Sequence, residues 1–169
     1  WSLVIAGDGP LKDELTEMTS NLNLDDKVFY PGYIQYNQIP IFYGLSSCFV
    51  LPSTTEQWGL VVNESLSCSK PVLVSKMCGS APNLVEGRDV GFTFDPYNKD
   101  DLLDKLKKIT VKENLIKFSE NAPKVMEEFD KYHYSSNLNK AAEAAIKFHN
   151  KKTNFLSMTI LNLLIAYSK

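Results

Sequence analysis

The chain has 169 residues, of which 44% are hydrophobic and 22% are charged, proportions that are typical of a soluble globular domain. Its formal net charge of −2 gives no electrostatic reason to expect nucleic acid as a partner. No apolar run reaches the roughly 18 residues that a membrane-spanning helix needs. Three cysteines in no metal-ligand spacing, without a secretory signal, predict reduced thiols in a cytoplasmic protein.

Short apolar segments alternate with helical patterns along the chain. Composition and flanking Gly and Pro residues predict strands at Ser2–Gly7, Lys27–Gly32, Cys48–Ser53, Pro71–Ser75 and Gly91–Pro96. Helical spacing predicts helices at Leu11–Leu22, Gly59–Cys68 and Asn98–Ile109, a short helix or turn at both Gln38–Ser47 and Gly79–Gly87, and further helix from Glu113 to about Asn150. The segments Ser2–Gly7 and Cys48–Ser53 are apolar throughout, so we expect both to be buried strands.

The helix at Asn98–Ile109 carries the clearest local signals. Asn98 is expected to be its N-cap, because a short amide side chain can accept from the first free backbone N–H groups. Leu102, Leu103, Leu106 and Ile109 fall at helical spacing and are predicted to face the core.

The alternation of strands and helices predicts the α/β class, with a Rossmann-like parallel sheet, helices on both of its faces, and C-terminal helices after it. Right-handed crossovers bring the carboxyl ends of such strands to one edge, and ligands bind in the crevice there. The loops that follow the predicted strands should therefore lie near one another at that edge.

We expect the chain to be a piece of a longer protein, since it begins directly on a strand. Residues 1–150 are predicted to form the Rossmann-like domain, and residues 151–169 an apolar tail. The tail could form a helix that packs on this or a neighbouring domain. It could also rest on a membrane surface, because a basic step precedes its apolar segment.

Two glutamates, Glu56 and Glu64, flank the predicted start of a helix at Gly59. The first N–H groups of a helix have no intrahelical partner and favour an anion such as diphosphate, which Gly59 would let approach closely. The two carboxylates could then each accept from vicinal hydroxyls, one on a ribose and one on a sugar. Ordinary roles are also open: Glu64 suits any first helical turn, and Glu56 could be a solvated loop residue.

Other candidate sites have weaker support. The stretch GDGP contains Gly7 and Gly9 but departs from a dinucleotide fingerprint, because Lys12 stands where a third glycine should be. The two histidines, His133 and His149, fall in the late helices, away from the predicted edge. The sequence has no Cys/His/carboxylate cluster typical of a metal site, and no GxSxG nucleophile elbow.

The stretches GDGPLKDELTE, VFYPGY, CFVLPSTTEQWGLVVNESLSCSKPVLVS, CGSAPNLVEG and GFTFDP, taken in this order, resemble the C-terminal, donor-binding domain of the group 1 glycosyltransferases. These are retaining enzymes with two Rossmann-like domains, the GT-B fold. The resemblance covers about residues 1–106, and EQWGLVVNE looks most like bacterial members that build surface polysaccharides. It implies sugar transfer from a nucleotide diphosphate sugar, of the hexosyltransferase type, in polysaccharide or glycolipid synthesis.

The resemblance also implies roles for individual residues. Glu56 and Glu64 match the family's pair of glutamates, which implies that Glu64 binds the ribose hydroxyls and that Glu56, the candidate catalytic residue, positions the donor sugar. The resemblance further implies that the backbone N–H groups of Gly59, Leu60 and Val61 hold the diphosphate, and that Gln57 and Trp58 in the adjoining loop also bind the donor. Tyr33 would lie against the base, and Gly7 and Gly9 would form the floor of the pocket. No metal or other cofactor is expected.

Some features depart from the family pattern. The first strand–loop unit, with its Arg and Lys, and the N-terminal acceptor domain would both precede Trp1, so the isolated chain should not turn over. Ser69 stands at a usual Gly position, where left-handed geometry would cost about 1 kcal/mol. Asn83 replaces a common acid.

The alternatives are a non-catalytic nucleotide-binding module, a sugar-nucleotide epimerase of the same architecture, and a structural partner domain that uses its tail for assembly. Location at the inner face of the membrane remains an alternative to free cytoplasm.

Overall fold

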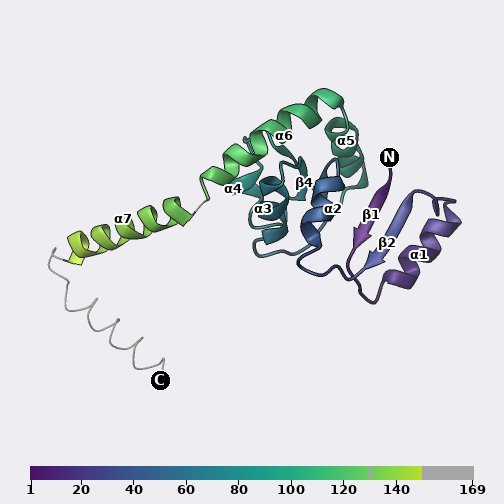
Figure 1. Ribbon diagram of the computed structural model, residues 1–169, viewed down its shortest axis with the longest axis horizontal. Coiled ribbons are helices and arrows are strands. Elements are labelled where there is room, and N and C mark those ends of the chain that lie inside the picture. Colours follow the sequence, from purple (N-terminus) through teal and green to yellow (C-terminus); the bar gives the residue numbers. More distant parts are fainter. Residues whose placement is uncertain (130, 150–169) are drawn as a thin grey trace, which may run out of the picture. The chain divides into compact units, whose positions relative to one another are not determined.

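The protein is described by a computed structural model that covers residues 1–129 and 131–149. The tail predicted at residues 151–169 lies outside these residues. The chain divides into two compact units, Trp1–Pro123 and the part from Lys124 onward. The strands all belong to the first unit, and Figure 1 labels the elements.

The strands are β1 (Leu3–Ala6), β2 (Val28–Gly32), β3 (Phe49–Leu51), β4 (Val72–Ser75) and β5 (Gly91–Phe94). The helices are α1 (Lys12–Asn21), α2 (Ile39–Leu45), α3 (Leu60–Ser67), α4 (Ala81–Leu84), α5 (Lys99–Ile109), α6 (Lys112–Glu127) and α7 (Lys131–His149). Each strand and helix expected up to Ile109 is present within a few residues of its predicted bounds.

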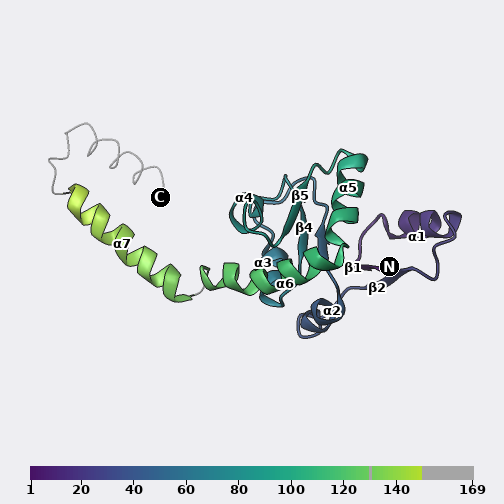
Figure 2. The ribbon, with the colours of Figure 1, turned by 90° about the horizontal axis from the view of Figure 1, so that it is seen from above.

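The strands pair in parallel, as the βαβ pattern predicts, but they form two sheets instead of one continuous sheet. One sheet contains β1 and β2, and the other has the order β3-β4-β5. Helix α1 lies alongside β2 in both views (Figures 1 and 2), where the Tyr30 hydroxyl donates to the carbonyl oxygen of Leu15 at 3.0 Å.

The core of the first unit is centred on β4, whose residues Val72, Leu73, Val74 and Ser75 are all fully buried. Leu73 packs in one buried cluster with Phe94 of β5, Ile109 of α5 and Phe118 of α6. Helix α3 contacts β3 and β4. A central strand covered on both faces explains why this segment reads as an unbroken apolar run.

Some burial predictions are wrong. Leu3 and Val4 of β1 are about half exposed, at 49% and 48%, because β2 is the only strand of the described residues that pairs with β1. In α5, Leu102 and Leu106 pack against the core and Ile109 is buried, but Leu103 is 48% exposed because it lies on the outer side of the helix.

Further along the chain, the helical pattern from Glu113 is interrupted. Helix α6 ends at Glu127, where Phe129 donates its backbone N–H to the Met126 carbonyl oxygen at 3.0 Å, and α7 begins at Lys131 as a single long helix (Figure 2).

The N-cap predicted at Asn98 is confirmed, and the structure also shows the backbone geometry at Ser69. Asn98 caps α5, because its Oδ1 accepts from the N–H groups of Asp100 and Asp101 at 3.0 and 3.1 Å. Ser69 adopts the left-handed conformation, with φ of 59°, at the end of α3. The N–H of Ser69 donates to Leu66 and that of Lys70 to Ser65, which is the hydrogen-bond pattern of a Schellman motif.

Candidate functional site

The loop that leads from β3 into α3 is held by the segment that follows β4. The backbone N–H of Glu56 donates to the carbonyl oxygen of Met77 at 3.4 Å, and the N–H of Gly79 donates back to Glu56 at 3.0 Å. The N–H of Ser80 donates to the Trp58 carbonyl oxygen at 3.2 Å. These bonds cross between two loops that follow adjacent parallel strands, so they fix the backbone on which Glu56 stands.

Glycine is required on both sides of this contact. A Cβ on Gly79 would overlap the carbonyl oxygen of Gln57, so no side chain fits there without moving backbone. Gly59 has φ of +80° and is the N-cap of α3, and a Cβ on it would lie 2.9 Å from Cys78 Sγ. A glycine at this position thus serves both the tight turn and the close packing.

Helix α3 begins at Leu60, directly after this turn, and its first N–H groups lack intrahelical partners by geometry. The carbonyl oxygen of Gly59 accepts from Val62 at 2.9 Å, which starts the helix. Leu60 is 68% exposed. Gly59 itself is buried. The positive end of the helix dipole lies at this turn, where an anion would be favoured.

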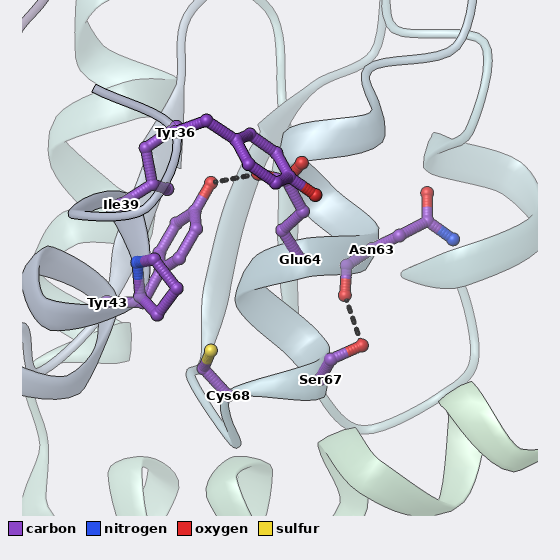
Figure 3. Close-up of a pocket in the computed structure, with 8 residues that line it drawn as sticks. Tyr36, Ile39, Tyr43, Asn63, Glu64, Ser67 and Cys68 are labelled. Atoms are coloured by element: carbon purple, nitrogen blue, oxygen red, sulfur yellow. Dashed lines mark hydrogen bonds between the residues drawn. The ribbon is translucent and has the colours of Figure 1, made fainter. Parts of the chain in front are cut away.

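A cavity of about 310 Å³ lies between α2 and the outer face of α3 (Figure 3). Its lining is aromatic and aliphatic on the α2 side and polar on the α3 side. The lining residues are Tyr36, Ile39, Pro40, Tyr43, Asn63, Glu64, Ser67 and Cys68. An open cavity with an apolar wall and one carboxylate suits a ligand that has a flat ring and hydroxyl groups.

The carboxylate of Glu64 is held at this cavity by Tyr43. The Tyr43 hydroxyl lies 3.2 Å from Glu64 Oε2 and 3.2 Å from the carbonyl oxygen of Val61, and it is placed to donate to either (Figure 3). The ring of Tyr43 is only 7% exposed and packs edge-on against Phe49 at 5.7 Å between centroids. Burial, followed by the negative charge of Glu64, raises the pKa of Tyr43, so its hydroxyl keeps its proton.

A second contact joins the loop to the helix. The indole Nε1–H of Trp58 donates to Asn63 Oδ1 at 2.9 Å. Within the loop, Glu56 Oε1 accepts from the backbone N–H of Trp58 at 3.4 Å. The side chain of Glu56 is half-buried and folds along its own loop, and it does not line the cavity.

The residues predicted from the sequence therefore fall into separate groups. Glu64 lines the cavity, and the backbone of Val61 contacts Tyr43 beside it. Gln57, Trp58 and Gly59 belong with Glu56 to the loop between β3 and α3, which is hydrogen-bonded to the segment after β4. Tyr33 is 73% exposed, and Gly7 and Gly9 lie in the loop between β1 and α1. None of these other predicted residues lines the cavity.

Sequence reasoning missed the α2 side of the site. Tyr36, Ile39 and Tyr43 line the cavity, but Tyr33 was the only residue of this stretch predicted to contact the donor. A signal was present, because Ile39 and Tyr43 are four residues apart and so lie on one face of a helix.

Within the described residues, no group of three or more His, Cys, Asp and Glu side chains could hold a metal ion. His133 belongs to α7, in the second unit. Among the helices of residues 1–129 and 131–149, none is both long and apolar enough to span a bilayer.

Comparison with known proteins agrees with this fold. The family model for glycosyl transferases group 1 matches residues 1–125. The chain is 28% identical over 106 residues to alpha-D-kanosaminyltransferase of Streptomyces kanamyceticus, covering 63% of this chain and 27% of that protein. It is 38% identical over 71 residues to alpha-monoglucosyldiacylglycerol synthase of Streptococcus pneumoniae, covering 42% of this chain and 16% of that protein. The chain thus spans less than two thirds of these relatives.

Solved structures show the same architecture. The C-terminal domain of a group 1 glycosyl transferase, LpcC from Francisella tularensis, superposes with a TM-score of 0.68 at 24% identity, over 78% of this chain and 70% of that one. Sucrose-phosphate synthase from Thermosynechococcus elongatus gives a TM-score of 0.70 at 20% identity, over 85% of this chain and 39% of that one. The α/β fold is that of the GT-B glycosyltransferases, and the chain belongs to the glycosyl transferases group 1 family.

Proposed function

We propose that this chain is the donor-binding part of a glycosyltransferase that transfers a sugar from a nucleotide diphosphate sugar to an acceptor, with retention of anomeric configuration. The observation that carries the proposal is the position of Glu64. Its carboxylate faces the cavity beside α2, and it lies just over one helical turn after the N-terminus of α3. Diphosphate at that N-terminus and ribose hydroxyls at Glu64 would be adjacent parts of one ligand.

The other assignments follow from the same placement. The N–H groups of Gly59, Leu60 and Val61 would meet the diphosphate, and Glu56, on the loop between β3 and α3, would position the sugar. The aromatic wall of the cavity offers a surface for a base. Catalysis would then consist of holding the donor and stabilising the leaving diphosphate with fixed dipoles, without an enzymatic nucleophile in this chain and without a metal.

Known proteins support the ligand class. A structure similar to this chain, HepE from Anabaena, is described in complex with UDP-glucose, with a TM-score of 0.70 at 22% identity. Among curated relatives, the sulfoquinovosyl transferase of Arabidopsis thaliana, which is 30% identical over 109 residues, is a transferase by name, and the relative from Streptococcus pneumoniae is named a monoglucosyldiacylglycerol synthase. The second name is that of an enzyme that makes a glucosylated lipid, so glycolipid synthesis stands beside polysaccharide synthesis in the proposal.

The remaining parts of the proposal concern the whole protein. Residues 1–150 would be a donor domain without its first strand–loop unit, and a strand between β1 and β3 would join the two sheets. An acceptor domain would supply the other wall of the cleft. Cytoplasmic location, with peripheral contact at the inner face of the membrane, is the proposed setting.

The test is a titration of the chain with UDP, GDP and ADP by calorimetry. Wild type should bind at least one of them, and Glu64→Ala should weaken that binding by about 1–3 kcal/mol through loss of the ribose contact. Glu17→Ala, on the exposed face of α1, is the matched control and should bind as wild type does. Equal affinity of the Glu64 variant and wild type would refute the assigned role.

Transfer itself needs the full-length protein. Incubation with the preferred nucleotide sugar and an acceptor lipid, followed by NMR of the product's anomeric proton, should show the donor's configuration. An inverted product would refute retention. Tight binding without any transfer or hydrolysis would favour the non-catalytic nucleotide-binding module.

A further inference from the structure

We propose that Tyr43 is a positioning residue that holds the carboxylate of Glu64 in the orientation needed to accept ribose hydroxyls. This inference rests on the proposed function, and it adds a residue from a different element to the site. Tyr43 belongs to α2, whereas the two glutamates and the N–H groups assigned to the donor belong to α3 and to the loop before it.

The contact has the geometry of an anchor. The Tyr43 hydroxyl lies 3.2 Å from Glu64 Oε2 and also 3.2 Å from the carbonyl oxygen of Val61, which belongs to the first turn of α3. The same hydroxyl therefore relates the carboxylate to the helix start where diphosphate would lie. Tyr43 therefore lies within hydrogen-bonding distance of both places that one nucleotide would have to reach together.

The anchor is itself rigid. The Tyr43 ring is 7% exposed and packs edge-on against Phe49 of β3. Glu64, by contrast, is half-buried at the edge of an open cavity. A flexible carboxylate at such a place must be ordered on binding, and a prior hydrogen bond from a packed side chain reduces that cost.

The hydrogen bond leaves room for a ligand. An ionised carboxylate offers about four lone-pair positions. Tyr43 occupies one of those on Oε2, so Oε1 and the remaining position on Oε2 stay available for two vicinal hydroxyls. A phenol that keeps its proton meets the carboxylate as a donor, so a nucleotide that uses the remaining positions would not have to displace it.

The experiment compares Tyr43→Phe with wild type in the full chain, using the nucleoside diphosphate that wild type binds and its 2′,3′-dideoxy analogue. Phenylalanine keeps the packing against Phe49 and removes only the hydroxyl. We expect binding of the normal nucleotide to weaken about tenfold, and binding of the dideoxy analogue to be unchanged. In the Glu64→Gln background, the same substitution should have a much smaller effect, since the two residues act as a unit.

Tyr30→Phe is the matched control, because it also removes a hydroxyl that is hydrogen-bonded, here to Leu15 and Thr19 at 3.0 and 2.7 Å, far from α3 in sequence. It should leave both affinities unchanged. If Tyr43→Phe binds the nucleotide as wild type does, the positioning role is refuted and the proposed function stands. An equal loss for both ligands would mean that Tyr43 acts only on the fold, which also refutes the role. If the folded wild-type chain binds no nucleotide, the proposed function fails and this inference fails with it.

Discussion

The left-handed geometry of Ser69 gives a stability prediction that depends on no ligand. Ser69 follows the C-terminus of α3 with φ of 59°. Its Cβ is close to a carbonyl oxygen in this conformation, which costs an L-residue about 1–2 kcal/mol. Glycine avoids that cost, but it adds about 0.4–1 kcal/mol of unfolded-state entropy that folding must overcome. The difference predicts that Ser69→Gly stabilises the protein by about 0.5–1 kcal/mol.

The hydrogen bonds of the motif should survive the change, because they come from backbone atoms. The N–H of Ser69 donates to Leu66 at 2.9 Å and that of Lys70 to Ser65 at 3.1 Å. Thermal unfolding followed by circular dichroism should show a rise in Tm of about 1–4 °C for a chain of this size. Denaturant unfolding should show a higher midpoint with an unchanged slope.

Two variants show whether geometry is the cause. Ser69→Ala keeps the Cβ and should not gain stability. Ser67→Gly makes the same chemical change inside the last turn of α3, where the backbone is right-handed, and should lose about 0.5 kcal/mol or more. If Ser69→Gly is no more stable than wild type while Ser67→Gly behaves as expected, the assigned strain at Ser69 is refuted.

Other substitutions test the contact between the two loops at Gly79, the N-cap Asn98 and the buried Tyr43. Gly79→Ala should lower Tm by several degrees, because its Cβ would meet the Gln57 carbonyl, whereas Gly9→Ala, with open space around it, should have little effect. Asn98→Ala should cost about 1 kcal/mol in denaturant unfolding. The pKa of Tyr43 is raised by burial and by Glu64, so its contribution to stability is complete below about pH 10 and declines as the pH rises above it. Tyr43→Phe should therefore flatten the loss of stability above about pH 10 in alkaline unfolding curves.

Local signals in the sequence were sufficient to predict the elements up to Ile109 and several of their ends. The apolar run at Val72–Ser75, the Asn98 cap and the backbone at Ser69 all depend on a few neighbouring residues, and the structure shows each of them. Periodicity was less informative about which side of α5 is buried. Leu103 matches the helical pattern as well as Leu102 does, but only the packing partners decide which of them faces the sheet.

Local signals do not predict which strands pair with one another, nor which side chains of distant elements come into contact. Nothing local to β1 indicates that β2 is its only partner strand in the described residues, so its apolar residues were expected to be buried. The cavity is formed where α2 meets α3, and its key contact joins Tyr43 to a residue 21 positions later. The glutamate was identified from its position relative to the helix start, whereas its hydroxyl partner requires knowledge of how the helices pack.

The contacts around the site also suggest that its two ends are held independently. Glu56 stands on a loop fixed by the segment after β4, through Met77 and Gly79. Glu64 is held from α2, through Tyr43. If the proposed roles are right, Gly79→Ala should weaken binding of a nucleotide sugar more than that of the free nucleotide, because it disturbs the sugar end. Tyr43→Phe should weaken both equally, because both carry the ribose. If Gly79→Ala weakens binding of both ligands equally, the loop and helix α3 are coupled and the two ends of the site are not held independently.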